Sequence, residues 1–202
     1  MSRRRRKKQK KKKLLTKKNL LGIFIVSIMV LSGVGYMWTD PQGGSSEDYN
    51  DYKFVSQNNQ WYTNINDQFV AFSHHPSDID EISVGSSIDL IKQTKMLYIT
   101  FDPDSLLVSD FEIKRLELEN ELSNHFTIFP ITGVTKNNSL YGHFPIINCI
   151  NATPSVPVIY FVKGNETKII QNGSCITLQA VDGYDVSIIK DRLMFGLFGI
   201  IE

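Results

Sequence analysis

The two cysteines of the chain, Cys149 and Cys175, are its clearest candidates for chemistry. An even number of cysteines outside the cytoplasm favours a disulfide. Such a bridge would close a loop of about 27 residues, for which the chain-entropy model gives about 3.5 kcal/mol of stabilisation. Redox catalysis normally uses two cysteines separated by only two residues, and often with a lowered pKa. The spacing therefore predicts a structural disulfide, with free or metal-bound thiols and redox catalysis as the alternatives.

Four Asn-x-Ser/Thr sequons form a second group of candidates, and three of them lie at predicted turns around the cysteines. They begin at Asn137, Asn151, Asn165 and Asn172. If the host glycosylates exported asparagines, these side chains are candidate acceptors. The alternative is that Asn and Gly serve only as turn formers in these segments.

The histidines lack the spacing of a metal site. They are His74, His75, His125 and His143. The adjacent pair would point to opposite faces of a strand, and no H-x-x-x-H or H-E-x-x-H motif occurs. An acidic cluster of Asp78, Asp80 and Glu81 lacks the glycine and the terminal glutamate of a calcium-binding loop. The sequence therefore predicts neither a metal nor a cofactor.

No recognised catalytic motif is present, so no catalytic residue is assigned. The chain has neither a G-x-S-x-G elbow nor a glycine-rich phosphate loop with its lysine. A site assembled from scattered residues stays open, as in an envelope enzyme or a thiol-redox factor. Its candidates are Cys149, Cys175, His74 and Asp102.

The charges of the chain are divided near the amino terminus. Twelve of the 22 Lys and Arg residues precede Asn19, and all 21 acidic residues follow Trp38. The ten Lys and Arg residues and the 21 acidic residues after the head give the remainder a charge of −11. The net charge of +1 therefore hides a cationic head and an anionic remainder.

An uncharged segment, residues 20–38, separates the two parts. As a helix it would span about 28 Å, close to the hydrocarbon thickness of about 30 Å. Tyr36 and Trp38 would lie at the outer headgroups, and the positive-inside rule places the basic head, residues 1–19, in the cytoplasm. We therefore predict a single-pass protein of the cell membrane with its carboxyl-terminal part outside. A signal peptide cleaved after Gly35 is the alternative.

The parts on either side of this segment have different expected roles. The basic head would attract anionic lipid headgroups by about 1 kcal/mol per basic residue. It lacks the aromatic side chains that would stack on bases, so no specific nucleic acid is expected. Residues 39–51 are rich in Gly, Ser and acidic side chains, which predicts a flexible linker. Residues 52–202 are long enough for one compact extracytoplasmic domain.

The first half of this domain is predicted to begin with a three-stranded meander. Its strands are 53–56, 61–65 and 68–72, joined by Asn-rich turns. A short helix follows at 88–93, and then an apolar strand at 96–101 whose two faces are expected to be buried. Ser109 is expected to cap a longer helix that ends near Asn124.

The second half begins with a strand at 126–134, which Pro130 predicts to lie at an edge. Three further strands are expected as successive hairpins, at 158–162, 168–171 and 175–180. A final helix at 186–197, capped by Asp185, has one apolar face. The elements predict an α+β domain with a mixed, mostly antiparallel sheet and about three helices.

Several short motifs in this half occur in a distinctive order. They are Cys149, Asn151-Ala152-Thr153, Val158-Ile159-Tyr160, the segment Gly164 to Lys168, Cys175-Ile176 and the closing segment Asp191 to Ile200. In this order they resemble uncharacterised single-pass membrane proteins of archaea with small genomes. The resemblance implies the layout of an anchor followed by a domain and supports the pairing of the cysteines. It implies no known activity.

These observations predict a membrane-anchored extracytoplasmic domain that binds another envelope protein or a cell-surface component. Its excess of acidic residues would keep it soluble and favour basic or cationic partners. The envelope enzyme or thiol-redox factor is the second hypothesis, and a cytoplasmic role for the basic head is the third.

Overall fold

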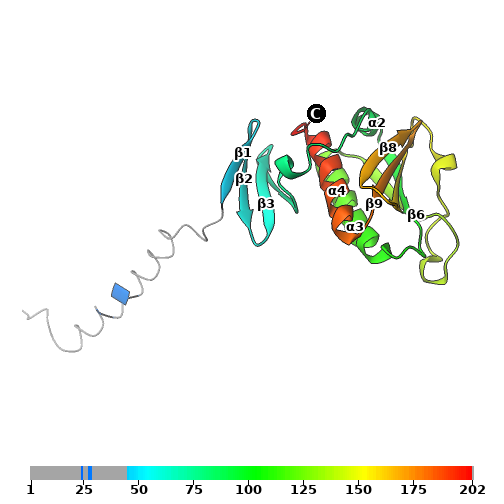
Figure 1. Ribbon diagram of the computed structural model, residues 1–202, viewed down its shortest axis with the longest axis horizontal. Helices are drawn as coiled ribbons and strands as arrows, with labels where there is room; N and C mark the ends of the chain where they lie inside the picture. Colours follow the sequence, from blue (N-terminus) through cyan, green and yellow to red (C-terminus); the bar gives the residue numbers. More distant parts are fainter. Residues whose placement is uncertain (1–23, 25–26, 29–44, 202) are drawn as a thin grey trace, which may run out of the picture. The chain divides into compact units, whose positions relative to one another are not determined.

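The computed structural model describes residues 24, 27–28 and 45–201 (Figure 1). Contacts between Cα atoms divide the chain into two units, Met1–Gly43 and Gly44–Glu202. The basic head and most of the predicted transmembrane segment lie outside the described residues. None of the helices formed by the described residues has the length and apolar character needed to cross a bilayer. The predicted span at 20–38 therefore stays a prediction.

The second unit opens with a four-stranded antiparallel sheet, which we call the meander. Its strands are β1 (Ser46–Tyr49), β2 (Tyr52–Gln57), β3 (Gln60–Ile65) and β4 (Gln68–Phe72). Both predicted turns are present, and each has two residues with positive φ, Asn58-Asn59 and Asn66-Asp67. Such turns match the twist of a hairpin, and Asn and Asp tolerate that conformation better than most residues. The predicted three-stranded meander is confirmed, and the observed sheet has one additional strand, β1.

The added strand, β1, falls inside the segment 39–51 that the composition predicted to be a linker. Its sequence Ser-Glu-Asp-Tyr has no apolar alternation, so periodicity gives no strand signal. It forms because β2 offers a free edge, and the two strands pair from Ser46 opposite Val55 to Tyr49 opposite Tyr52. The ordered domain therefore begins before residue 52.

The second sheet has five strands in the order β6-β5-β7-β9-β8, and we call it the mixed sheet. Their bounds are β5 (Met96–Phe101), β6 (Phe129–Val134), β7 (Val158–Lys163), β8 (Lys168–Asn172) and β9 (Cys175–Ala180). Strand β6 lies at an edge, as Pro130 predicted. The fold class α+β with mixed strands and three helices is confirmed for the described residues.

The prediction of a mostly antiparallel sheet is wrong for this second sheet. Three of its four pairings are parallel, and only β8 with β9 is antiparallel. The hairpin expected between β7 and β8 does not form, because β9 inserts between them. The apolar runs of β5 and β7 are typical of parallel strands with two covered faces. The strong turn sequences outweighed that signal in the prediction.

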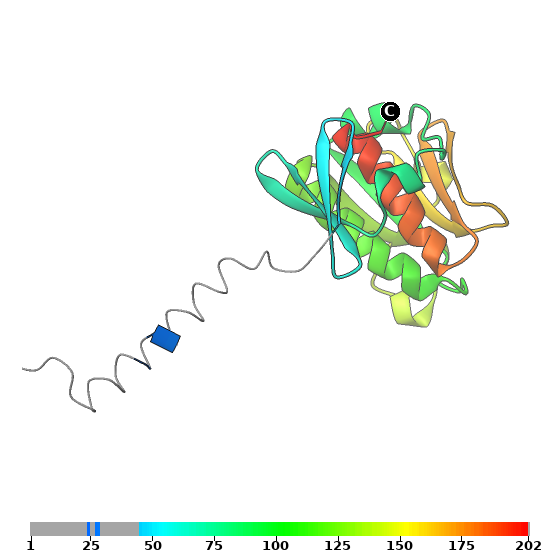
Figure 2. The ribbon, with the colours of Figure 1, turned by 60° about the vertical axis from the view of Figure 1, so that its left-hand side comes forward.

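Two long helices cover one face of the mixed sheet and separate it from the meander (Figures 1 and 2). They are α3 (Val108–His125) and α4 (Gly183–Phe198), and α2 (Ser87–Lys92) is shorter. Helix α4 was predicted to have one apolar face, but it is buried on nearly all sides. Phe195 of α4 packs on Phe72 of the meander, with ring centroids 4.3 Å apart. Helix α4 is therefore the centre of the core.

Both predicted helix caps are displaced. Helix α3 begins after Leu107, so Ser109 lies inside its first turn and does not cap it. The cap of α4 is Asp182, whose carboxylate accepts a hydrogen bond from the amide of Asp185. The Asp185 carboxylate instead accepts hydrogen bonds from the amide of Val181 and from the hydroxyl of Thr167. Asp185 thus ties the start of α4 to the turn before β8.

A buried carboxylate on α4, Asp191, joins the helix to the meander. Its Oδ2 accepts hydrogen bonds from the backbone amides of Ser73 and His74, at 2.7 and 3.0 Å, and lies 3.0 Å from His74 Nδ1. Its Oδ1 lies 2.7 Å from Lys190 Nζ, which is also 3.4 Å from a carboxylate oxygen of Glu117. Asp191 and Lys190 are 0 and 2 % exposed.

The charges of this pair are retained because each compensates the other. Burial alone would raise the pKa of Asp191, but the Lys190 ammonium and the His74 hydrogen bond lower it below its ordinary value. Burial would likewise lower the pKa of Lys190, but the Asp191 and Glu117 carboxylates raise it. Removing one partner would leave an uncompensated buried charge.

We predict that Asp191→Asn lowers the free energy of unfolding by about 3–5 kcal/mol, because it leaves Lys190 buried beside a neutral amide. Urea unfolding of the whole chain at pH 7 measures this loss. The exposed carboxylate Asp89 of α2 supplies the matched control, and Asp89→Asn should change the free energy by less than about 0.5 kcal/mol.

The same pair of proteins should show a pH dependence with a defined sign. The Asp191 carboxyl has a lowered pKa in the folded state, so it stabilises the fold above its unfolded pKa of about 3.9 and loses this effect as the pH falls through the folded value. The difference between wild type and Asp191→Asn should therefore shrink only in acid below about pH 3.9. A difference that already disappears at pH 6 would contradict this assignment.

Candidate binding surface on a disulfide-linked loop

A long connection, residues 135–157, joins β6 to β7 and carries one of the two cysteines and two of the four sequon asparagines. It contains only two short 3-10 helices, η2 (Ser139–Tyr141) and η3 (Cys149–Asn151). We call it the β6–β7 loop. Loops longer than about 12–15 residues without regular structure are uncommon in compact domains, and the ordered ones are usually functional.

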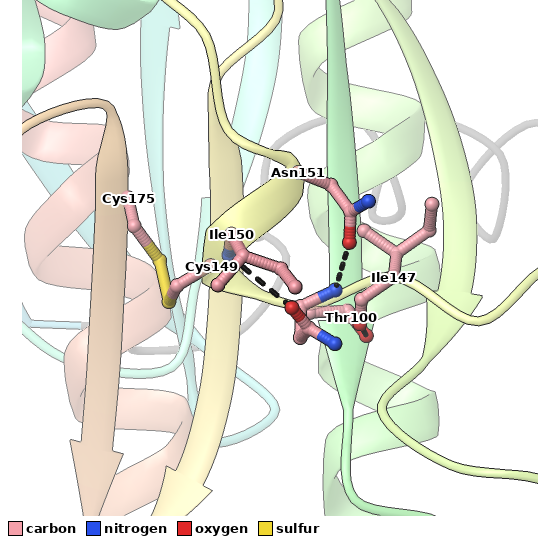
Figure 3. Close-up of a disulfide and its surroundings, with 7 residues drawn as sticks. Thr100, Ile147, Cys149, Ile150, Asn151 and Cys175 are labelled. Atoms are coloured by element: carbon pink, nitrogen blue, oxygen red, sulfur yellow. Dashed lines mark hydrogen bonds between the residues drawn. A yellow bond between two sulfur atoms is a disulfide. The ribbon is translucent and has the colours of Figure 1, made fainter.

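The β6–β7 loop lies on the face of the mixed sheet opposite the helices, where Ile147 packs with Val158 and Cys175. Its backbone is bonded to the end of β6, since the amide of Val134 donates to Pro145 O at 3.0 Å and that of Ile147 donates to Val134 O at 2.9 Å. The Thr100 hydroxyl of β5 donates to Ile147 O at 2.8 Å (Figure 3). The middle of the loop is therefore fixed to the sheet.

Glycine is required where this loop crosses β6. A Cβ added to Gly133 would lie 2.6 Å from Ile147 Cγ1 and 3.0 Å from the carbonyl oxygen of Pro145. Such distances are well inside van der Waals contact, so any larger residue would push the loop away from the sheet.

The predicted disulfide between Cys149 and Cys175 is present in the structure, with an S–S distance of 2.01 Å and a Cα–Cα distance of 5.3 Å. Cys175 is the first residue of β9 and is buried, whereas Cys149 begins η3 and is exposed (Figure 3). The bridge therefore links the second half of the β6–β7 loop to β9, an inner strand of the mixed sheet.

A reciprocal pair of asparagines shapes the exposed turn beside the disulfide. The Asn148 side chain accepts a hydrogen bond from the amide of Ile150 at 3.2 Å, and the Asn151 side chain accepts one from the amide of Asn148 at 2.9 Å (Figure 3). This is a capping box built from two amides. It fixes the backbone of η3 while the side chain of Ile150 stays 90 % exposed.

The surface of this loop is uncharged and carries exposed aliphatic side chains. No Asp, Glu, Lys or Arg occurs between residues 137 and 162, although the rest of the chain after the head is rich in acidic residues. Leu140, Ile146 and Ile150 are 79, 54 and 90 % exposed, and we call these three side chains the loop surface. Depletion of charge with exposed apolar side chains is typical of the core of a protein interface.

All four sequon asparagines are exposed. Asn137 and Asn151 lie on the β6–β7 loop, Asn165 lies in the turn between β7 and β8, and Asn172 ends β8 opposite Cys175. Asn151 also serves in the capping box, so its side chain has a structural role that does not depend on a glycan. Glycosylation of these positions stays a prediction.

The structure does not bring together the residues of the scattered-site hypothesis. The disulfide lies at the start of β9, whereas Asp102 follows the end of the parallel strand β5, about 13 Å further along the strand direction at about 3.3 Å per residue. Asp102 is paired there with Lys136, at 2.9 Å. His74 is engaged with Asp191 in the core. These residues therefore do not form one site.

The remaining histidines occupy separate environments. His75 packs against Trp61 of the meander, with ring centroids 4.7 Å apart, and His143 contacts Phe144. His125 lies 3.6 Å from the Glu121 carboxylate on the last turns of α3. Within the described part of the chain, no cluster of three or more His, Cys, Asp or Glu side chains could hold a metal ion.

Comparison with known proteins gives no family for this chain: no protein-family model, no curated protein and no solved structure matches it. Both cysteines are identifiable from the sequence, whereas the loop surface was not predicted. The signal that could have identified it was present, because the uncharged stretch from 137 to 162 is visible in the sequence.

Replacing both cysteines by serine should lower the free energy of unfolding by about 3.5 kcal/mol, because the unfolded chain is no longer constrained. Hydrogen exchange should show the largest loss of protection in the β6–β7 loop rather than in β5 or β7. Equal exchange of the loop with and without the disulfide would contradict its role in holding the loop.

Two glycines of the same region provide a matched test of the loop crossing. Gly133→Ala should cost about 1–3 kcal/mol in urea unfolding, because the added methyl group overlaps Ile147. Gly142→Ala should stay within about 0.5 kcal/mol, since its new Cβ meets nothing closer than 3.9 Å. Equal costs for the two substitutions would show that the close approach at Gly133 is not a constraint.

Proposed function

We propose that this protein is a membrane-anchored extracytoplasmic binding protein that contacts another envelope protein through the loop surface. The observation that carries the proposal is the uncharged stretch from 137 to 162, which displays three exposed aliphatic side chains in an acidic domain. A binding role needs no catalytic constellation, and none of the candidate residues for one are assembled in a single place.

The way in which the loop is held supports a binding role. Ordering a flexible loop upon association costs free energy, and a loop that is fixed beforehand avoids that cost. The disulfide, the Thr100 hydrogen bond and the capping box fix the β6–β7 loop in the free protein. Ile150 is thus presented on a rigid support, as the central side chains of protein interfaces commonly are.

The charge division of the sequence supports the anchored topology. The basic head would lie in the cytoplasm against anionic lipid headgroups, and residues 20–38 would cross the membrane. Phe24, Ser27 and Ile28, the described residues of that segment, are helical, which is in keeping with a span there. The disulfide is in keeping with an oxidising compartment for the domain.

Site-specific photo-crosslinking in the protein's own cells tests the proposed contact. A benzophenone amino acid at position 150 or 146 should give one adduct of defined mass, and the same group at Leu116 on α3, which is 51 % exposed, should not. In an Ile146→Asp background the adduct at position 150 should fall by about 10-fold, corresponding to about 1.4 kcal/mol of lost affinity.

Three results would overturn the proposal. The first is an adduct at position 116 that matches the adducts at 146 and 150. The second is an adduct with twice the mass of the chain, which would identify a second copy rather than another protein. The third is an adduct at 150 that Ile146→Asp leaves unchanged.

A further inference from the structure

A groove lies where the meander meets the carboxyl-terminal ends of α3 and α4. It consists of a cavity of about 400 Å³ and a second cavity of about 600 Å³, and Tyr52 of β2 lines both. Pockets that bind small molecules typically have volumes of about 300–1,000 Å³. The two cavities together are therefore large enough for a ligand of one to a few rings.

Three exposed primary amides line the first cavity. Asn66 lies in the turn between β3 and β4, Gln68 begins β4, and Asn124 comes from the last turn of α3. Each primary amide offers two N–H donors and a carbonyl acceptor. A hydroxyl group also donates and accepts, so neighbouring amides are well suited to bind neighbouring hydroxyl groups.

Half-buried aromatic rings line the same cavity. Phe126 and Phe198 lie with ring centroids 5.0 Å apart, and the His125 ring meets Phe198 edge-on at 5.3 Å. Tyr52 of the meander adds a further ring. Aromatic rings bury the C–H face of a ligand while the amides bind its polar edge.

The lining has almost no formal charge. Among the described residues, the wall of the first cavity has no Asp, Glu, Lys or Arg, and that of the second has Asp51 alone. Phosphate and carboxylate ligands are bound most strongly by Arg or Lys, and cationic ligands by carboxylates. The groove therefore favours a neutral ligand, which distinguishes it from the rest of this acidic domain.

The second cavity extends the groove along the end of the chain. Asn50 donates a hydrogen bond to the carbonyl oxygen of Ile200 at 2.8 Å, and this contact holds the turn between β1 and β2 against the segment after α4. Gly199, with φ of 74°, turns the chain out of the helix at this point. The wall of the second cavity is therefore fixed, and Tyr49 and Tyr52 supply phenol groups beside it.

We propose that this groove binds a neutral, polyhydroxylated ligand, namely an uncharged saccharide of one to a few rings. Amide side chains, aromatic rings and the absence of charge together match the hydroxyl groups and C–H faces of such a sugar. The groove is formed by the meander, α3 and α4, whereas the loop surface lies beyond the mixed sheet. The saccharide site therefore does not depend on the proposed protein contact.

Ligand-observed NMR with the whole chain tests this site, using four neutral probes and one charged probe. The neutral probes are maltotriose, cellotriose, mannotriose and fully N-acetylated chitotriose, and the charged one is trigalacturonic acid. At least one neutral probe should bind with Kd of about 1 mM or tighter, and the charged one should bind at least about 10-fold more weakly. Asn124→Ala and Gln68→Ala should each weaken binding by about 3- to 10-fold, the range expected for one lost hydrogen bond.

Asn64→Ala is the matched control, because Asn64 is an exposed amide of β3 outside the groove. It should leave binding unchanged, and thermal unfolding of all three variants should match wild type, since the three side chains are exposed. The proposal is overturned if no neutral probe binds at about 10 mM. It is equally overturned if the charged probe binds best, or if Asn64→Ala weakens binding as much as Asn124→Ala does.

Discussion

The hydrogen bonds that the buried Asp191 carboxylate of α4 accepts from the segment after β4 hold the meander to the helices that cover the mixed sheet. Lys190 and Asp191 form a buried ion pair in the middle of α4. The Asp191 carboxylate also accepts hydrogen bonds from two backbone amides of the segment after β4. Burying a charge is costly unless it is paired and hydrogen-bonded, so the meander is bound to α4 in one arrangement. The aromatic rings of Phe72 and Phe195 then pack across the same junction. The groove lies beside this junction, where Asn66 and Gln68 of the meander line it together with Asn124 of α3.

A second constraint acts on the far side of the mixed sheet. There the covering layer is not a helix but the β6–β7 loop, and its stability depends on the Cys149–Cys175 bridge, on Gly133 and on a threonine hydroxyl. The domain therefore offers two surfaces of different chemistry, an uncharged aliphatic one and an amide-lined groove. Both contrast with the acidic character of the chain after the basic head. A net negative charge there helps to keep the domain soluble.

The sequence predicted those parts of the fold that depend on local signals. The meander turns were predicted from Asn58-Asn59 and Asn66-Asp67, and the edge position of β6 was predicted from Pro130. The disulfide was predicted from the presence of only two cysteines. It failed where pairing depends on distant strands, since no local pattern shows that β9 inserts between β7 and β8. Strand β1 was missed because its polar sequence forms a strand only against β2. The groove could not be predicted from the sequence for the same reason, because its three amide side chains come from separate elements that only the tertiary fold brings together.

The central claim is that the loop surface holds another envelope protein, and the size of the native complex tests it most directly. Blue-native electrophoresis of gently solubilised membranes compares the wild-type chain with a variant that carries both Ile146→Asp and Ile150→Asp, two positions exposed enough to accept a charge without unfolding. The account predicts that the wild type migrates in a complex larger than the chain alone and that the variant migrates as the free chain. Identical migration of the two proteins would contradict it.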